Sequence, residues 1–518
     1  MEEASQTFAH DIRPLVRRLG KPPADWQRAD LVRVCEEDGI RVLNLHYPAL
    51  DGKLKELRVP VNSTAYLKRI LAAGERVDGS SLFPGVFEPG QSDLYVIPVY
   101  RWAFLNPWAP DELDIVCRFA GKDGQPCPVT YDNLLFAAAE GLKSKTGLEL
   151  SALAELEFYL ILHRKDDRFT GLPQKNYHQS APYLHSRPLA DEILRVLSSV
   201  TGCLKYCHSE VGYIDRLESE DPELDGKRVE QYEVEFDTMP IAELGCWLAV
   251  GRWLIRMIAD HYSASVTFLP KLDEGMAGSG MHLHMALTRD GVNVMRGGAA
   301  ADGGLSSEAL RLIGGLLNHA PELTAFGNTV AASYLRLVPG QEAPVNVCWG
   351  FSDRASLIRV PLSFDVDVRM DQLMNPGETG DVPQRLARPT VELRSPDGSA
   401  FTYLLLAGMV MAIEDGLLDP QAEVLARELM NDGRGPDRAS RLQRAKSLPT
   451  SAVGAARELR GARAFFEKRG FPPQLIDIVI AKLDDEDDDD LSARLRSLPP
   501  SERLKRARRI MHKDLHKH

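Results

Sequence analysis

Alternating and helical runs of hydrophobic residues divide the chain into a small N-terminal part and a larger C-terminal part. Residues 40–45 and 55–61 have the pattern of strands around a turn at Asp51-Gly52, and residues 65–73 have helical spacing. A further helix is expected over 134–146, after a turn at Pro128. We therefore predict a small α/β domain over 26–129, preceded by an extension over 1–25 that has little periodicity.

The larger part has strand-like segments with charged residues on one face, which is typical of an α+β domain. We place this domain over residues 130–483. Helical periodicity predicts its main helices over 189–201, 240–261, 305–323, 401–414 and 473–483.

The chain ends in a charged segment over 484–518. Residues 484–490 are all acidic, and residues 491–518 carry nine Lys or Arg side chains against two acidic ones. Such blocks are usually solvated helix surfaces or disordered tails. The alternative is a contact with nucleic acid or lipid, which predicts salt-sensitive binding that is lost on truncation.

Composition narrows the possible classes of protein mainly by exclusion. Hydrophobic residues make up 44% and charged residues 26% of the 518 positions, which excludes a disordered or fibrous chain. The formal net charge of −12 argues against a general nucleic-acid-binding protein, which should be basic. The longest apolar stretch, 401–413, is too short to cross a membrane, and no signal peptide is visible. Seven scattered cysteines without a Cys-x-x-Cys pair indicate reduced thiols in a cytoplasmic protein.

Four strand-like segments place two polar side chains two positions apart. Because residues i and i+2 of a strand point to the same face, each pair presents its polar groups side by side. A sheet carrying all four pairs would gather carboxylates and imidazoles, which suit Mg²⁺ or Mn²⁺. For a single pair, the wet face of an amphipathic strand is the commoner explanation. The pairs are Glu155/Glu157, Glu233/Glu235, His282/His284 and Glu392/Arg394.

Isolated arginines gather in the segment 333–361, where Arg336, Arg354 and Arg359 surround Glu342. Guanidinium groups suit carboxylate and phosphate oxygens, although a lone Arg is more often part of a structural salt bridge. The sequence contains no glycine-rich nucleotide loop, no Gly-x-Ser-x-Gly elbow and no His-Glu-x-x-His motif. If this protein uses ATP, metals and arginines must hold the phosphates.

Taken in order, these segments resemble the glutamine synthetase family from about residue 26 to about residue 483. The most specific piece is Gly278–His284, which reads Gly-Ser-Gly-Met-His-Leu-His. The other matching segments are Asp78–Ser81, Ser92-Asp93, Pro107-Trp108, Glu155–Phe158, Gln231–Glu233, Arg336–Pro344, Asp353-Arg354, Ile358–Pro361 and Glu392–Asp397.

The resemblance implies an α+β fold, with a small N-terminal β-grasp domain and a large catalytic domain on a curved antiparallel sheet with flanking helices. It also implies homo-oligomeric rings, usually two stacked hexamers, whose active sites lie between neighbouring subunits. Small-molecule substrates are the expected partners, whereas a membrane or a nucleic acid is not.

The resemblance further implies ATP as a substrate and two or three Mg²⁺ or Mn²⁺ ions per active site. The ligands implied for one ion are Glu157, Glu210 and Glu233, and those for another are Glu155, His282 and Glu392.

Other residues acquire roles from the same resemblance. Asp78 and Asp93 of the adjacent subunit would bind and deprotonate ammonium, and Glu342 would lie on a flap that shields the intermediate. Arg354 would act on the phosphates in catalysis together with Arg359. The residues implied for substrate binding are Gly278, His284, Arg336 and Arg394.

The sequence departs from the family pattern at positions near the substrate. Glu210 and Glu233 are 23 positions apart, much further than usual, because of a polar insertion over 213–228. We expect this insertion to be a surface loop that could reshape the substrate mouth. Ala277 stands where relatives often have Asn, which removes one contact to the amino acid. The implied metal ligands are kept, whereas contacts to the substrates vary.

We therefore expect an ATP-dependent carboxylate–amine ligase. The leading hypothesis is a glutamine synthetase, which forms glutamine from glutamate and ammonia through γ-glutamyl phosphate. The alternative within this chemistry is a γ-glutamyl ligase for an organic amine or polyamine. A non-catalytic ring-forming homologue is the third hypothesis, but it predicts lost metal ligands, and all six implied positions hold competent residues.

Overall fold

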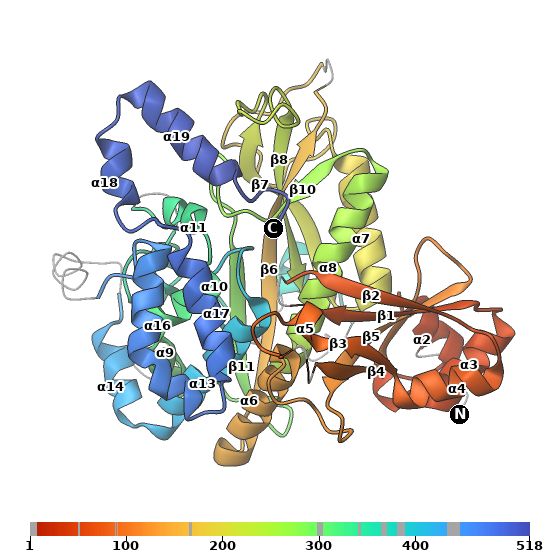
Figure 1. Cartoon of the computed structure of the whole chain (residues 1–518). Coiled ribbons are helices and arrows are strands. Elements are labelled where there is room, and N and C mark those ends of the chain that lie inside the picture. Colours follow the sequence, from red (N-terminus) through yellow and green to blue (C-terminus); the bar gives the residue numbers. More distant parts are fainter. Residues whose placement is uncertain are drawn as a thin grey trace.

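The computed structural model describes residues 8–49, 52–88, 90, 92–164, 168–297, 304–339, 343–363, 370–380, 389–431 and 446–517 (Figure 1). Asp51 of the predicted turn and Glu342 of the predicted flap lie outside these residues.

A five-stranded mixed sheet forms the N-terminal domain. Its order is β2-β1-β5-β4-β3, with β1 and β5 parallel and the other pairs antiparallel. Helix α4 (Thr64–Ala73) begins where the Ser63 hydroxyl accepts a hydrogen bond from the Tyr66 amide, and it buries Leu67, Ile70 and Leu71. The strands are β1 (Val42–Pro48), β2 (Leu54–Pro60), β3 (Glu75–Asp78), β4 (Asp93–Leu105) and β5 (Glu112–Ala120).

The described part of the predicted extension is packed on this sheet. Helix α2 (Pro14–Leu19) buries Leu15 and Val16 and contacts β4, and η1 (Pro23–Asp25) also contacts β4. Helix α3 (Arg28–Glu37) follows and contacts α4. Helix α2 and η1 are too short to produce a detectable period in the sequence, which is why the pattern did not predict them.

A ten-stranded sheet forms the centre of the large domain. The main order is β13-β14-β15-β11-β6-β8-β7, and every pair except β13/β14 is antiparallel. The long strands β6 (Glu149–Leu162) and β11 (Met281–Arg289) run through its middle (Figure 1). The other strands are β7 (Leu204–Ile214), β8 (Arg228–Phe236), β9 (Met239–Pro240), β10 (Ser265–Thr267), β12 (Val292–Asn293), β13 (Trp349–Phe351), β14 (Ile358–Val360) and β15 (Val391–Leu393). The predicted fold class is therefore confirmed.

Helices flank this sheet. Helix α13 (Thr402–Leu418) is apolar on almost every side because it is buried between α6 (Tyr131–Thr146) and α9 (Ser307–Asn318). The prediction of one helix over 305–323 is wrong, because the structure has two helices there. Helix α9 ends at Asn318, and α10 (Ala320–Gly327) begins with Pro321 in its first turn, where a proline is tolerated. The other helices are α5 (Gly79–Leu82), α7 (Arg187–Thr201), α8 (Ile241–His261), α11 (Ala331–Arg336), α12 (Met370–Met374), α14 (Gln421–Glu428), α16 (Ala452–Glu467) and α17 (Pro473–Asp484).

The charged C-terminal segment is helical over much of its described length. Helices α18 (Leu491–Arg496) and α19 (Pro500–His512) contact each other, and α19 also contacts α11 (Figure 1). In the acidic run, Asp488 is buried and accepts hydrogen bonds from the Ala452 and Val453 amides, at 2.9 and 3.1 Å, at the start of α16. Within the described part of the chain, every helix is too short or too polar to span a bilayer.

Candidate active site

Strand register brings the predicted polar pairs onto one face of the large sheet. Glu155 on β6 is directly opposite His282 on β11, and Glu157 is directly opposite Glu233 on β8. His284 is opposite Glu392 on β15. Directly opposed residues of an antiparallel pair share a face, so the four pairs converge on one surface as their period-two spacing predicts.

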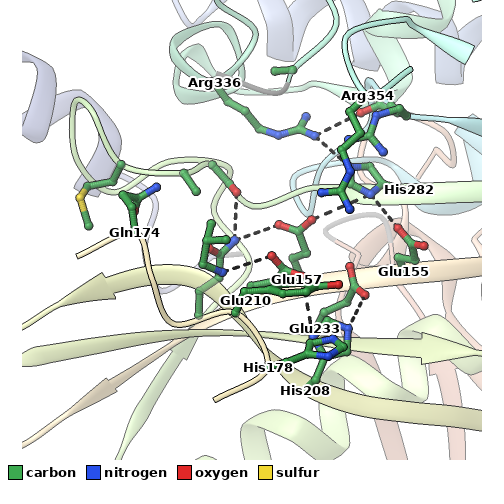
Figure 2. A pocket seen from close by; sticks show the side chains of 18 of the residues that line it. Glu155, Glu157, Gln174, His178, His208, Glu210, Glu233, His282, Arg336 and Arg354 are labelled. Atoms are coloured by element: carbon green, nitrogen blue, oxygen red, sulfur yellow. Dashed lines mark hydrogen bonds and ion pairs between the residues drawn. The ribbon is translucent and has the colours of Figure 1, made fainter. Parts of the chain in front are cut away.

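A cavity of about 770 Å³ opens over this face (Figure 2). Glu392 and His284 lie beneath its surface rather than in its lining. The predicted site residues that line it are Glu155, Glu157, Glu210, Glu233, Gly278, His282, Arg336, Arg354, Arg359 and Arg394.

Three groups of side chains could each hold a metal ion, because the ligand atoms within each group all lie within 4.8 Å of one another. Glu155, His282 and Glu392 form one group, as the resemblance implies. The other two groups divide the remaining set differently from the expectation, because Glu157 and Glu210 fall in separate groups that share Glu233. These groups are Glu157/Glu233/His282 and His208/Glu210/Glu233.

Histidine and arginine partners lower the pKa of two of the carboxylates. His282 Nδ1 and His284 Nε2 lie 2.8 and 3.0 Å from the two oxygens of Glu155. Burial alone would raise the pKa of Glu155, but these hydrogen bonds hold it well below its ordinary value. Burial likewise opposes ionisation of Glu392, whose pKa is nevertheless lowered by the charge of Arg394. Arg359 Nη1 donates to Glu392 at 2.8 Å.

Two other carboxylates are in the opposite electrostatic situation. Burial and the charges of Glu155 and Glu157 raise the pKa of Glu233 well above its ordinary value. Burial, with the charges of Glu157 and Glu233, raises the pKa of Glu210 to about 8. Crowded carboxylates of this kind fit a divalent cation, which would remove their repulsion, and their oxygens with imidazole nitrogens suit Mg²⁺ or Mn²⁺.

The glycine-rich segment before β11 forms one wall of the cavity. A Cβ atom at Gly278 would lie 2.6 Å from Cγ of Arg336 and 2.9 Å from the Pro270 carbonyl oxygen, so only glycine fits there. The Gln231 amide donates to the Gly278 carbonyl at 2.9 Å and to Glu157 at 2.9 Å. This network fixes the wall against one of the candidate metal ligands.

Arg336 is buried beside this wall. Its Nη1 donates to the Ser395 carbonyl at 2.8 Å and its Nη2 to the Arg394 carbonyl at 3.1 Å. The guanidinium is therefore held in one orientation at the edge of the cavity (Figure 2).

A group of rings at the cavity mouth was not predicted. His178 stacks on Tyr177 with centroids 4.1 Å apart and lies 4.2 Å from the His208 ring, which Tyr206 also contacts. His208 Nε2 is 3.1 Å from Glu233. The His208-Ser209-Glu210 spacing obeys the same period-two rule as the predicted pairs and could have identified His208. Tyr177 and His178 lie in a loop, where no comparable sequence signal exists.

Asp78 and Asp93 lie apart from the cavity of their own chain. They are paired at the ends of β3 and β4 in the N-terminal domain, and both are exposed. Asp78 accepts hydrogen bonds from the Ser80 amide at 3.0 Å and the Ser80 hydroxyl at 2.8 Å. Hydrogen bonds from Ser81, Ser80 and Ser92 hold the pKa of Asp78 well below its ordinary value. Arg76 Nη1 lies 3.3 Å from Asp93.

Comparisons with known proteins identify the relatives of this chain. The profile of the glutamine synthetase catalytic domain matches residues 133–489. Glutamine synthetase of Pyrococcus horikoshii is 29% identical over 393 residues, which are 76% of this chain and 78% of that protein. Glutamine synthetase of Thermus thermophilus is 28% identical over 404 residues, which are 76% of this chain and 80% of that protein.

Solved structures share the fold at low sequence identity. A cryo-electron microscopy structure of Plasmodium falciparum glutamine synthetase superimposes with a TM-score of 0.70 at 18% identity, over 92% of this chain and 98% of that one. A structure described as GmaS without ligand superimposes with a TM-score of 0.68 at 21% identity, over the same shares of the two chains. Because the catalytic-domain profile matches well over half of this chain, the chain belongs to the glutamine synthetase family, and it is an ATP-dependent ligase that forms carbon–nitrogen bonds.

Proposed function

We propose that this enzyme joins ammonia to the γ-carboxyl group of glutamate with the use of ATP, which is the reaction of a glutamine synthetase. The observation that carries this proposal is the convergence of three clusters of carboxylate and imidazole side chains at one cavity. The same cavity is lined by Arg336, Arg354, Arg359 and Arg394. That charge pattern suits a triphosphate and an amino acid held side by side.

The chemistry requires activation of a carboxylate. Oxide is a poor leaving group, so a phosphoryl group is first transferred from ATP to the carboxylate, and an amine then displaces phosphate from the acyl phosphate. Bound divalent ions would neutralise the charge that develops on the phosphoryl group. The residues proposed to hold them are Glu155, Glu157, Glu210, Glu233, His282 and Glu392, with His208 added by the geometry of the site.

The arginines have separate proposed roles. Arg336, held rigidly beside Gly278, would bind the substrate carboxylate together with Arg394, whereas Arg354 and Arg359 would contact phosphate oxygens. His284 contacts Glu155 and lies below the cavity surface, so its support for substrate binding would act mainly through Glu155.

The acceptor site would be completed by a neighbouring subunit. Asp78 and Asp93 are exposed on the N-terminal domain and do not line the cavity of their own chain, which suits a role across an interface between subunits. The low pKa of Asp78 fits the binding of an ammonium cation better than the acceptance of its proton. Glu342, outside the described residues, remains the proposed flap residue that keeps water from the acyl phosphate.

A second candidate is a γ-glutamyl ligase for an organic amine or polyamine. The ring group Tyr177/His178/His208 beside Glu210 favours it, because aromatic faces next to carboxylates attract alkylammonium cations.

Phosphate release from the purified enzyme with ATP, glutamate and Mg²⁺ or Mn²⁺ separates the two candidates. We expect turnover with millimolar ammonium. Turnover only with members of an amine panel would replace the first candidate with the second, and the absence of turnover with either acceptor would contradict both.

A further inference from the structure

The C-terminal segment extends beyond the part of the chain that matches the catalytic-domain profile, which ends at residue 489. Helix α19 leads the chain back across the large domain, so that the C-terminus lies near β7 and β10 (Figure 1). Leu515 is 2% exposed and packs in one hydrophobic cluster with Leu217, Leu224, Leu269 and Leu272. A segment that charge alone would place in solvent is therefore docked on the domain.

The docked segment contacts two loops, one of which lines the cavity, whereas the other connects two strands that carry candidate metal ligands. The insertion loop is residues 215–227, between β7 and β8, which carry Glu210 and Glu233. The wall loop is residues 268–280, between β10 and β11, and its residues 275–278 line the cavity.

Arg508 of α19 joins the two loops. Its Nε and Nη2 atoms donate to the two carboxylate oxygens of Asp273 in the wall loop, each at 2.9 Å. Its Nη1 donates to Glu218 in the insertion loop. The Arg508 and Asp273 side chains are only 16% and 14% exposed, so this bidentate pair is partly shielded from solvent.

His512, one helical turn later, makes a second bridge between the same loops. Its Nε2 lies 2.9 Å from the Leu272 carbonyl oxygen, and its Nδ1 lies 3.0 Å from the Ser219 hydroxyl. With the proton on Nε2, the ring donates to the carbonyl and accepts from the hydroxyl, so both contacts are satisfied by the neutral imidazole. Arg503 adds a third contact, to Glu274 at 3.0 Å.

These contacts reach the cavity through a short, tightly bonded stretch of chain. Residues 272–274, which the segment holds, directly precede the lining residues 275–278. The Tyr159 hydroxyl donates to the Ala277 carbonyl at 2.9 Å, and the Ser279 amide donates to the Pro270 carbonyl at 2.9 Å. Residues 275–277 connect residues 272–274 to Gly278, so a shift of residues 272–274 would strain the bonds that hold Gly278 against Arg336.

We propose that the C-terminal segment 491–517 is a clamp that positions the wall loop for the amino-acid substrate, with Arg508 as its principal positioning residue. This inference rests on the proposed function, because it assigns the wall at Gly278 and Arg336 to the amino acid. The clamp acts through position only, and no atom of Arg508 lines the cavity.

The test compares Arg508→Ala with the neighbouring Arg509→Ala in the full-length enzyme. Arg509 also makes a bidentate pair on α19, with Glu220 at 2.8 and 2.9 Å, but Glu220 is in the insertion loop and not in the wall loop. Amide hydrogen exchange of peptides covering 269–280 should be faster in Arg508→Ala and unchanged in Arg509→Ala. This readout does not depend on any catalytic activity, so it can succeed even if the proposed reaction fails.

Steady-state kinetics give the second readout. We expect KM for glutamate to rise about tenfold in Arg508→Ala, because the variant loses one partly buried charge pair. The values of kcat and of KM for ATP should change less than about twofold. Arg508→Lys, which keeps the charge but loses the fork, should be intermediate. Adding Asp273→Ala to Arg508→Ala should cause little further change, because both substitutions remove the same pair.

Unchanged exchange over 269–280 in Arg508→Ala and Arg508→Lys would overturn the clamp. Faster exchange with unaltered KM for glutamate would overturn its role in substrate positioning. An equal effect of Arg509→Ala would overturn the assignment to Arg508. If Arg508→Ala does not fold, Arg508→Lys with both readouts decides the same questions.

Discussion

His282 Nδ1 lies 2.8 Å from Oε2 of Glu155, its directly opposed neighbour across β11 and β6. This contact joins side chains of two neighbouring strands, and Glu392 completes the three-residue candidate metal group. An ion bound there would replace the imidazole–carboxylate contact with bonds to both groups.

We therefore expect Glu155→Gln to weaken Mn²⁺ binding by at least roughly tenfold and to lower ATP-dependent turnover by about a hundredfold or more. The amide keeps the shape of the side chain but has neither the charge nor the second anionic oxygen. Calorimetric titration with Mn²⁺ and phosphate release measure the two effects. Glu149→Gln is the matched control, because Glu149 is on the same strand but pairs with Lys143 outside the cavity. Wild-type behaviour of Glu155→Gln would contradict the assignment.

Glu210 predicts how pH and metal act together on stability. Burial raises its pKa from 4.5 to about 8 in the metal-free fold, so the folded protein binds this proton more tightly than the unfolded chain does. The contribution of Glu210 to the free energy of unfolding should therefore fall as the pH rises from about 4.5 to about 8. Saturating Mg²⁺ should reduce this fall, because the ion stabilises the ionised form.

Urea unfolding with EDTA and with Mg²⁺, at about pH 5.5 and about pH 8, measures this linkage. Glu210→Gln should flatten the pH dependence without metal. If the variant and the wild type show the same slope in EDTA, the raised pKa is not the cause.

Gly278 predicts a specific loss of amino-acid affinity. A Cβ atom there would approach the Arg336 side chain to 2.6 Å, so Gly278→Ala must displace either the wall or the guanidinium. We expect KM for glutamate to rise about tenfold or more, with a smaller change in KM for ATP. Gly461→Ala is the control: nothing lies within 4 Å of its Cβ position in α16, and it should stabilise the fold by about 0.5 kcal/mol.

The rings at the cavity mouth predict an effect confined to the acceptor. His178→Ala removes a ring that contacts both Tyr177 and His208, so we expect KM for an organic amine, the acceptor of the second candidate, to rise about threefold to tenfold. KM for ATP and glutamate should change little. The exposed His163 provides the control variant His163→Ala. Equal changes for all three substrates would indicate a general disturbance of the loop instead.

The proposed sharing of active sites between subunits predicts complementation between inactive variants. Asp78→Asn and Glu233→Gln should each abolish most turnover, yet their co-assembled mixture should recover about a quarter of wild-type activity if each site takes one residue from each of two subunits. Activity of co-expressed, doubly tagged oligomers measures the recovery. No recovery in verified mixed rings would contradict the proposal that Asp78 acts across an interface.

Local spacing was sufficient to predict part of the site. Period two in β6 and β11 places Glu155 with Glu157, and His282 with His284, on shared faces, because side-chain alternation is a property of each strand by itself. The same rule places His208 and Glu210 on one face of β7. The apolar periodicity does not reveal the helix break at His319, because it continues through the first turn of α10, where Pro321 is tolerated.

By itself the sequence determined the class of chemistry and the faces on which its polar pairs lie, because motifs and strand alternation depend only on residues that are close together in the chain. Only the tertiary structure decided which faces meet: β6 lies between β11 and β8, which come from distant parts of the chain, and this register places Glu233 in two candidate metal groups. It also decided that a highly charged C-terminal segment docks rather than extends into solvent. Charge and period describe one segment at a time, whereas contacts such as Arg508 with Asp273 depend on the packing of all the elements between them.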